Sequence, residues 1–251
     1  MPTAAKNRNH APLRMTKKTK AILFSSLALL LLGGGGACFY YLQQQKEPTT
    51  PFSTEDANGL PALARKQIGV TVGYSPDYVV LDYPGGDVPM ETGVCTDVVV
   101  RALRHKGIDL QQWVHEDMEK NFRKYPGRKL WKQRAVDSSI DHRRVPNLEV
   151  FFERIGWSVT NTPGTDPSAY LPGDLVTCFD KEHGRPHIMI VSDRKDAATG
   201  IPKVIHNSGQ GTQENDALFA FPVTGHYRPV YGEEIVLPGQ QTKPESSESK
   251  K

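Results

Sequence analysis

Cysteine is scarce in this chain: three residues of 251, namely Cys38, Cys95 and Cys178. Cys38 lies in an apolar N-terminal segment, so a folded domain after that segment contains only Cys95 and Cys178. Small exported folds that depend on disulfides carry more cysteines than this, so the composition excludes a disulfide scaffold. Cys178 fits a buried apolar position in a predicted strand. A single Cys95–Cys178 disulfide in an oxidising compartment is the alternative, and it would block the Cys95 thiol.

The net charge of the chain is also small. The formal net charge is +3, and six cations between Lys6 and Lys20 exceed it on their own. The rest of the chain is therefore close to neutral as a whole, and we expect no nucleic-acid partner. No Cys-x-x-Cys pair indicates a metal site, and we expect neither a metal nor a cofactor. No internal repeat is apparent.

One long apolar run is present, at residues 21–42. About twenty apolar residues span the core of a bilayer, and the cations before the run predict that this end stays in the cytoplasm. Three outcomes are open: an uncleaved signal anchor, cleavage near residues 33–37, and lipidation at Cys38. Each places the following domain outside the cytoplasmic membrane. We therefore expect a single-pass protein of the inner membrane, with its domain in the periplasm or outside the cell.

Composition divides the chain into five parts. A basic cytoplasmic N-terminus at 1–20 precedes the apolar segment at 21–42. The polar, proline-containing stretch 43–58 reads as a tether. A folded domain is expected over 59–236, and the tail 237–251 lacks apolar residues and is expected to be disordered.

Apolar residues recur at helical spacing in the first half of this domain and at strand spacing in the second half. The spacing predicts helices over 60–68, 95–106, 109–125 and 147–156. It then predicts strands near 174–179, 187–192 and 202–207. Helices followed by strands indicate an α+β fold, with N-terminal helices packed on a small antiparallel sheet.

Cys95 stands at the predicted start of a helix. Free backbone N–H groups and the positive end of the helix dipole favour a thiolate there. His187 and His206 lie on separate predicted strands, where one imidazole can accept the thiol proton and a second polar group can orient it. Asn207 is the alternative to His206, because neighbouring strand residues face opposite sides. Asp97, in the first helical turn, complements the dipole without a catalytic role.

The succession of residues 171–176, 187–191 and 204–206 resembles the strands of NlpC-like peptidases. These are papain-like enzymes that cut peptides of bacterial cell walls. The resemblance implies a papain-like fold in which Cys95 is the nucleophile, His187 the base and the histidine of 204–206 the third residue. One departure is the sequence Val-Cys-Thr-Asp, where these enzymes usually have Asp-Cys-Ser-Gly, and it affects the expected substrate pocket.

Three further motifs, 93–99, 141–145 and 225–228, resemble a bacterial family of unknown function, DUF1287. This likeness covers most of residues 60–230. It supports the same catalytic class without naming a substrate.

Four residues are candidates for substrate binding. Tyr83 can donate a hydrogen bond to the oxyanion or substrate, although packing is the simpler role. Arg143 and Arg144 can each bind a carboxylate through two parallel hydrogen bonds, or form a structural ion pair. Asn207 completes the set.

We therefore expect a membrane-tethered cysteine hydrolase that cleaves an amide bond in cell-wall peptides. A cysteine acyltransferase would use the same residues. A zinc site formed by Cys95, His187 and His206 is a second class. A non-catalytic wall-binding or envelope-assembly module on a papain-like scaffold is a third, because a fold does not determine a function.

Overall fold

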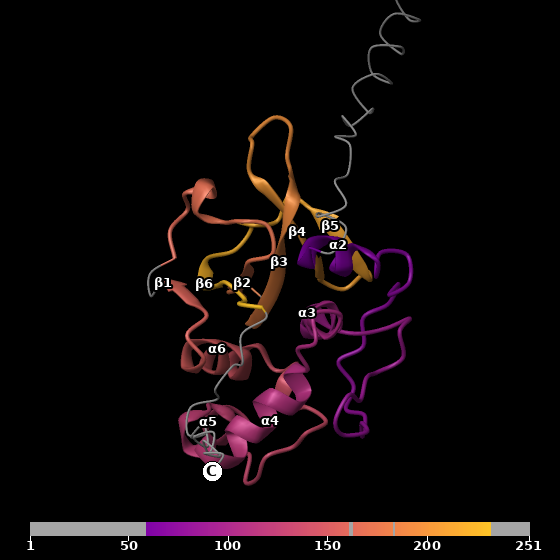
Figure 1. Cartoon of the computed structure of the whole chain (residues 1–251), viewed down its shortest axis with the longest axis vertical. Helices are drawn as coiled ribbons and strands as arrows, with labels where there is room; N and C mark the ends of the chain where they lie inside the picture. Colours follow the sequence, from indigo (N-terminus) through magenta and orange to yellow (C-terminus); the bar gives the residue numbers. More distant parts are fainter. Residues whose placement is uncertain (1–58, 161–162, 183, 232–251) are drawn as a thin grey trace, which may run out of the picture. The chain divides into compact units, whose positions relative to one another are not determined.

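The computed structural model describes residues 59–160, 163–182 and 184–231 (Figure 1). The helices within these ranges are α2 (Leu60–Arg65), α3 (Cys95–Arg104), α4 (Leu110–Asn121), α5 (Gly127–Leu130) and α6 (Val145–Arg154). Two short 3-10 helices lie between them, η2 (Phe122–Lys124) and η3 (Asp141–Arg143), and a third, η4 (Pro167–Ala169), follows α6.

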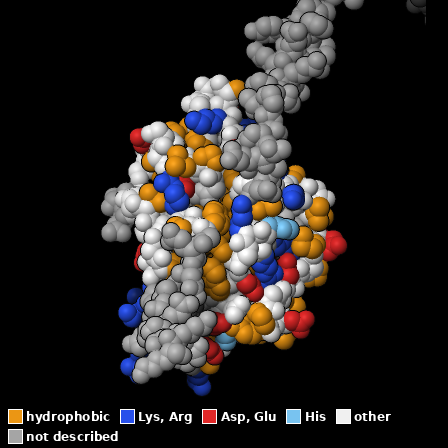
Figure 2. All heavy atoms as spheres, viewed as in Figure 1, with side chains coloured by type: hydrophobic (Ala, Val, Ile, Leu, Met, Phe, Trp, Pro, Cys, Tyr) orange, Lys and Arg blue, Asp and Glu red, His pale blue; other side chains and the backbone are white. Residues whose placement is uncertain are grey.

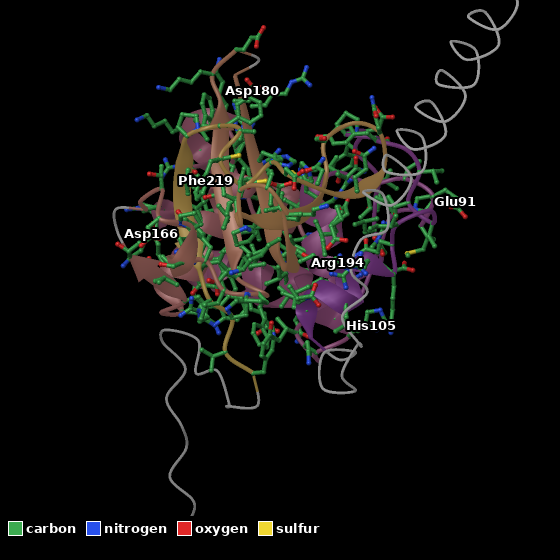
Figure 3. The ribbon with its side chains drawn as sticks, turned by 90° about the horizontal axis from the view of Figure 1, so that it is seen from above. Glu91, His105, Asp166, Asp180, Arg194 and Phe219 are labelled. Carbon is green, nitrogen blue, oxygen red and sulfur yellow. The ribbon has the colours of Figure 1, made fainter. Side chains whose placement is uncertain are left out.

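The second half of the described chain forms one antiparallel sheet with the strand order β1-β6-β2-β3-β4-β5. The strands are β1 (Ser158–Thr160), β2 (Leu175–Asp180), β3 (Arg185–Lys195), β4 (Pro202–Asn207), β5 (Thr212–Asn215) and β6 (Val223–Tyr227). Asp180, at the end of β2, and Arg194, near the end of β3, lie at opposite ends of the sheet (Figure 3). The predicted α+β class is confirmed.

Strand β3 lies between two hydrophobic clusters because alternate side chains point to opposite faces of the sheet. Ile188 and Ile190 pack with the helices, whereas Met189 and Val191 pack in a second cluster with Leu218. All five side chains are buried. Coverage on both faces explains why the centre of β3 is a continuous apolar run instead of an alternating one.

Helix α3 packs against β3 and β4 and places its apolar face in the larger cluster. Val98, Val99 and Leu103 are fully buried on that face. The helix ends close to the predicted boundary, before Gly107, whose φ of 78° lies in the left-handed region that glycine adopts most easily.

The other predicted boundaries differ in detail. The helix expected over 109–125 ends at Asn121, and the chain tightens into η2 before Pro126 and α5. Strands β1, β5 and β6 were not expected. These strands are short, polar or interrupted by Gly225, so they show little alternation. They form because β6 pairs with β2, β5 pairs with β4, and β1 pairs with β6.

Several expectations fall on residues that the structure does not describe. The segments 1–20, 21–42 and 43–58 and the tail 237–251 lie outside the described residues, and the expected domain 59–236 is described as far as residue 231. Among the described helices, none combines the length and the apolar composition needed to cross a bilayer. The prediction of a single-pass protein of the inner membrane is corrected on this point, since no described helix supports it.

The aromatic packing around α6 generates a test of the core. Phe152 is fully buried, with ring centroids 5.3 Å from Trp157 and 5.2 Å from Tyr227. We expect Phe152→Ala to lower the free energy of unfolding by about 3–5 kcal/mol, because it removes these contacts and leaves a cavity. Phe179→Ala is the matched control. Phe179 is 37% exposed, so this variant should lower the free energy of unfolding by only about 1 kcal/mol. Chemical denaturation measures both, and equal losses would contradict the described packing.

Candidate functional site

Cys95 is the first residue of α3, and a buried carboxylate fixes the start of this helix. Asp97 Oδ2 accepts a hydrogen bond of 2.6 Å from the backbone N–H of Val94. Arg143 donates to both oxygens of the same carboxylate, from Nε at 2.9 Å and from Nη2 at 3.0 Å. The side chains of Arg143 and Asp97 are only 2% and 4% exposed. The bidentate ion pair therefore sets the position of the thiol through the helix terminus.

Two arginines attach the loops around Cys95 to this terminus. Arg143 also donates to the backbone carbonyl of Asp77 at 3.3 Å and to that of Ser75 at 3.4 Å. Arg101, one helical turn after Asp97, donates to Asp87 and to the backbone carbonyl of Thr92. The loops that precede Cys95 are thus held by charged side chains from α3 and η3.

His187 and His206 form a direct pair. His187 Nε2 lies 2.6 Å from His206 Nδ1, and His206 Nε2 lies 3.0 Å from Asn215 Oδ1. An amide oxygen only accepts hydrogen bonds, so His206 Nε2 carries the proton of a neutral ring. His206 Nδ1 then accepts, and His187 Nε2 donates to it. The remaining nitrogen of a neutral His187, Nδ1, is therefore unprotonated and able to accept a proton.

Cys95 packs against β3. The backbone N–H of Ile188, the residue after His187, lies close enough to the Cys95 sulfur to lower the pKa of the thiol. No hydrogen bond joins the thiol to either imidazole among the described residues. Cys95 packs with Ile188 in the larger cluster, whereas His187 points to the other face of β3, as Met189 does. His206 lies on the same face as His187, so the structure pairs the two histidines and places neither imidazole against the thiol.

Burial dominates the ionisation of both groups. It raises the pKa of the Cys95 thiol to about 11, with a further contribution from Asp97, while nearby backbone N–H groups lower it. Burial, with the neighbouring His206, lowers the pKa of His187 to about 3. Both shifts favour the neutral forms. Desolvation therefore outweighs the effect of the helix terminus that predicted a thiolate. Cys95 is a neutral thiol and His187 a neutral imidazole.

A small cavity of about 240 Å³ opens beside Cys95. Tyr74, Trp131, Arg144 and Pro186 are among the residues that line it. The Arg144 guanidinium lies over the Trp131 ring, 4.2 Å from its centroid. The cavity thus offers a hydroxyl, an aromatic ring and a cation next to the thiol.

The predicted substrate-binding residues occupy four different settings. Arg144 lines the cavity, whereas Arg143 is buried against Asp97. Tyr83 packs edge-on against His115, with ring centroids 4.9 Å apart, and is not among the residues that line this cavity. Asn207 Nδ2 donates at 3.0 Å to the backbone carbonyls of Gly73 and Gly93 and ties two loops together.

Two residues of the site escaped the sequence analysis. Tyr74 lines the cavity, and burial, followed by proximity to Cys95, raises the pKa of its hydroxyl. Asn215 lies on β5, a strand whose polar sequence gave no signal, and it orients His206. Neither residue belongs to a recognisable motif, because its role depends on strand pairing and loop packing.

The second cysteine takes no part in a disulfide. Cys95 and Cys178 are both free and buried, and Cys178 lies opposite His187 in the β2–β3 register. Cys178 packs with the second cluster, as a small apolar side chain would. Within the described residues, no three His, Cys, Asp or Glu side chains come together in an arrangement that could hold a metal ion.

A buried thiol at the start of α3 and an oriented histidine pair on the sheet beneath it define a candidate thiol–imidazole site on this α+β domain. The family model described as "Domain of unknown function (DUF1287)" matches residues 62–229, which is more than half of the chain. The chain therefore belongs to this family, as its motifs predicted. It is 54% identical to the uncharacterized protein YijF of Escherichia coli (strain K12) over 165 residues, which cover 66% of this chain and 78% of YijF.

The raised pKa of Cys95 generates a direct test. We expect the rate of Cys95 alkylation by iodoacetamide to rise about tenfold per pH unit up to pH 10 without a plateau, because only the thiolate reacts. Mass spectrometry of the Cys95 peptide separates this thiol from the others. A short cysteine peptide, which levels off above about pH 8.5, is the control. A plateau below pH 8 would show a preformed thiolate–imidazolium pair instead.

The buried ion pair generates a second test. We expect Asp97→Asn to lower the free energy of unfolding by about 3–5 kcal/mol, because it leaves the Arg143 charge buried without a counter-ion. Asp193→Asn is the control: Asp193 pairs with Arg65 at the surface, where such pairs contribute about 0–1 kcal/mol. Denaturant titration compares the two variants, and a loss for Asp97→Asn no larger than the control would contradict the role given to this pair.

Proposed function

We propose that this protein is a papain-like cysteine hydrolase that cleaves an amide bond in cell-wall peptides. The observation that carries the proposal is the hydrogen-bond order Asn215–His206–His187, which leaves His187 Nδ1 as a free base on β3, the strand against which the Cys95 helix packs. The packing of a cysteine-bearing helix on an antiparallel sheet with histidines on two strands supports an NlpC-like placement. The substrate class rests on the resemblance to those enzymes.

The proposed mechanism starts from a neutral thiol and a neutral imidazole, and it requires the His187 ring to reach Cys95 when substrate binds. His187 Nδ1 takes the Cys95 proton as the sulfur attacks the amide carbonyl, so charge develops only along the reaction. The backbone N–H of Cys95, as the first residue of α3, and the Tyr74 hydroxyl are the candidate donors to the oxyanion. The imidazolium then protonates the leaving amine, and the acyl enzyme forms. Water, deprotonated by His187, releases the acid and restores the thiol.

Arg144 is the candidate for substrate recognition. It lines the cavity beside Cys95, and its position over Trp131 orients the guanidinium. Cell-wall peptides carry carboxylates, which an arginine can bind through two parallel hydrogen bonds. A cysteine acyltransferase would share every step up to the acyl enzyme and differ only in the acceptor.

One observation favours a non-catalytic alternative. Cys95 has a raised pKa and no hydrogen bond to His187 in the described structure. Both features fit a wall-binding or envelope-assembly module in which the thiol is a packing residue.

Digestion of purified peptidoglycan tests the proposal. We expect the full chain to release new peptide termini, with Cys95→Ala removing turnover and His187→Ala lowering it by about 10²–10⁴-fold, as for loss of a general base. Cys178→Ala is the matched control and should retain activity, because Cys178 packs in the second cluster. Mass spectrometry of the products identifies the bond. Equal release of peptide termini by the wild type and Cys95→Ala would rule out this thiol as the nucleophile. Binding of the wild type to peptidoglycan without release of peptide termini would favour the non-catalytic module.

A further inference from the structure

A dense run of cations follows α4. Between Lys120 and Arg134 the sequence has seven Lys and Arg residues and no Asp or Glu. All seven side chains are exposed. We call residues 120–134 the basic segment. The whole-chain charge of +3 conceals it, because acidic residues elsewhere balance the sum. The folded part of the chain can thus be close to neutral as a whole and still concentrate cations at this surface.

The basic segment lines an open hollow of about 830 Å³. Six of the seven cations line it: Lys120, Arg123, Lys124, Arg128, Lys132 and Arg134. Glu119 is the one acidic residue that the described lining contains. None of the six forms an ion pair with another described residue. Blue side chains emerge at the lower rim of the molecule in Figure 2, the end at which Figure 1 places α5.

The fold holds these like charges close together. Tyr125, in the middle of the segment, is buried and donates a hydrogen bond of 2.6 Å to Asp117 on α4. Trp131 N–H and Gln133 N–H both donate to the Gly127 carbonyl, which curls the chain over α5. Cations gathered around a concave surface repel one another, and they concentrate anions in the hollow. A bound anion would relieve this repulsion.

The aromatic residues of the segment argue against recognition of bases. Phe122 packs against the core and Tyr125 is buried, whereas Trp131 has Arg144 over one face and does not line the hollow. Single-stranded nucleic acids are usually bound on free aromatic faces in addition to cations. The hollow presents charge without such a platform.

We propose that the basic segment binds a linear polyanion, through phosphate or carboxylate groups that repeat along its chain. The hollow lies near the Cys95 cavity. Gln133 lines the hollow and accepts a hydrogen bond of 3.2 Å from Arg144, which lines the cavity. The proposal does not depend on hydrolysis by Cys95.

Binding of fluorescent polyphosphate and poly-glutamate to the full chain at low salt tests the proposal. We expect the triple variant Lys120→Gln, Lys124→Gln and Lys132→Gln to lose at least about tenfold in affinity for the preferred polymer. The control replaces Lys66, Lys181 and Lys195 by Gln. These three lysines are exposed and lie outside the hollow, so the net charge changes equally. The control should stay within about twofold of the wild type.

The preferred polymer distinguishes phosphate from carboxylate recognition, and either preference supports the proposal. Equal losses in both triple variants would overturn it, because net charge alone would then explain binding. So would absence of binding by the wild type, or tighter binding of a single-stranded oligonucleotide than of both polymers. Cys95→Ala should bind like the wild type, so failure of the hydrolase proposal leaves this test intact.

Discussion

The ion pair between Asp97 and Arg143 is the interaction on which the site depends. It joins the start of α3 to η3 and, through two further hydrogen bonds of Arg143, to the loop at residues 75–77. Both charges are buried, so each would carry a large desolvation cost without the other. The pair therefore links three segments that are distant in sequence, and the wall of the Cys95 cavity has a defined position because of it.

The environment of Cys95 shows which electrostatic effect is larger at this helix terminus. The dipole and the nearby N–H groups favour a thiolate, but the sulfur is almost completely buried and Asp97 lies within the same helical turn. Desolvation is the larger effect, and it also keeps His187 neutral. A site of this kind gains reactivity only when proton transfer accompanies attack on a bound substrate. The hydrogen bonds from His187 through His206 to Asn215 set one tautomer of the neutral His187 ring.

The two proposed sites differ in how they use charge. At the Cys95 cavity, buried charges are paired and position the neutral thiol at the start of α3. At the basic segment, exposed cations lack described counter-ions and surround a hollow. Arg144 and Gln133 connect the two surfaces by a hydrogen bond. Membership of the DUF1287 family and the likeness to YijF extend this arrangement of elements to relatives without assigning an activity to any of them.

The sequence by itself determined the α+β class, the apolar face of α3, the order of helices before strands and Cys95 at a helix start, because these follow from local periodicity and capping. Tertiary structure decided the rest. Arg143 forms a buried ion pair with Asp97, and Tyr83 packs against His115. Tyr74 lines the Cys95 cavity instead. The spacing of residues in the sequence predicts none of these placements. Strand β5 exists because it pairs with β4. The pKa values of Cys95 and His187 also depend on the tertiary structure. Both are shifted by burial, and the residues that bury them are distant in sequence.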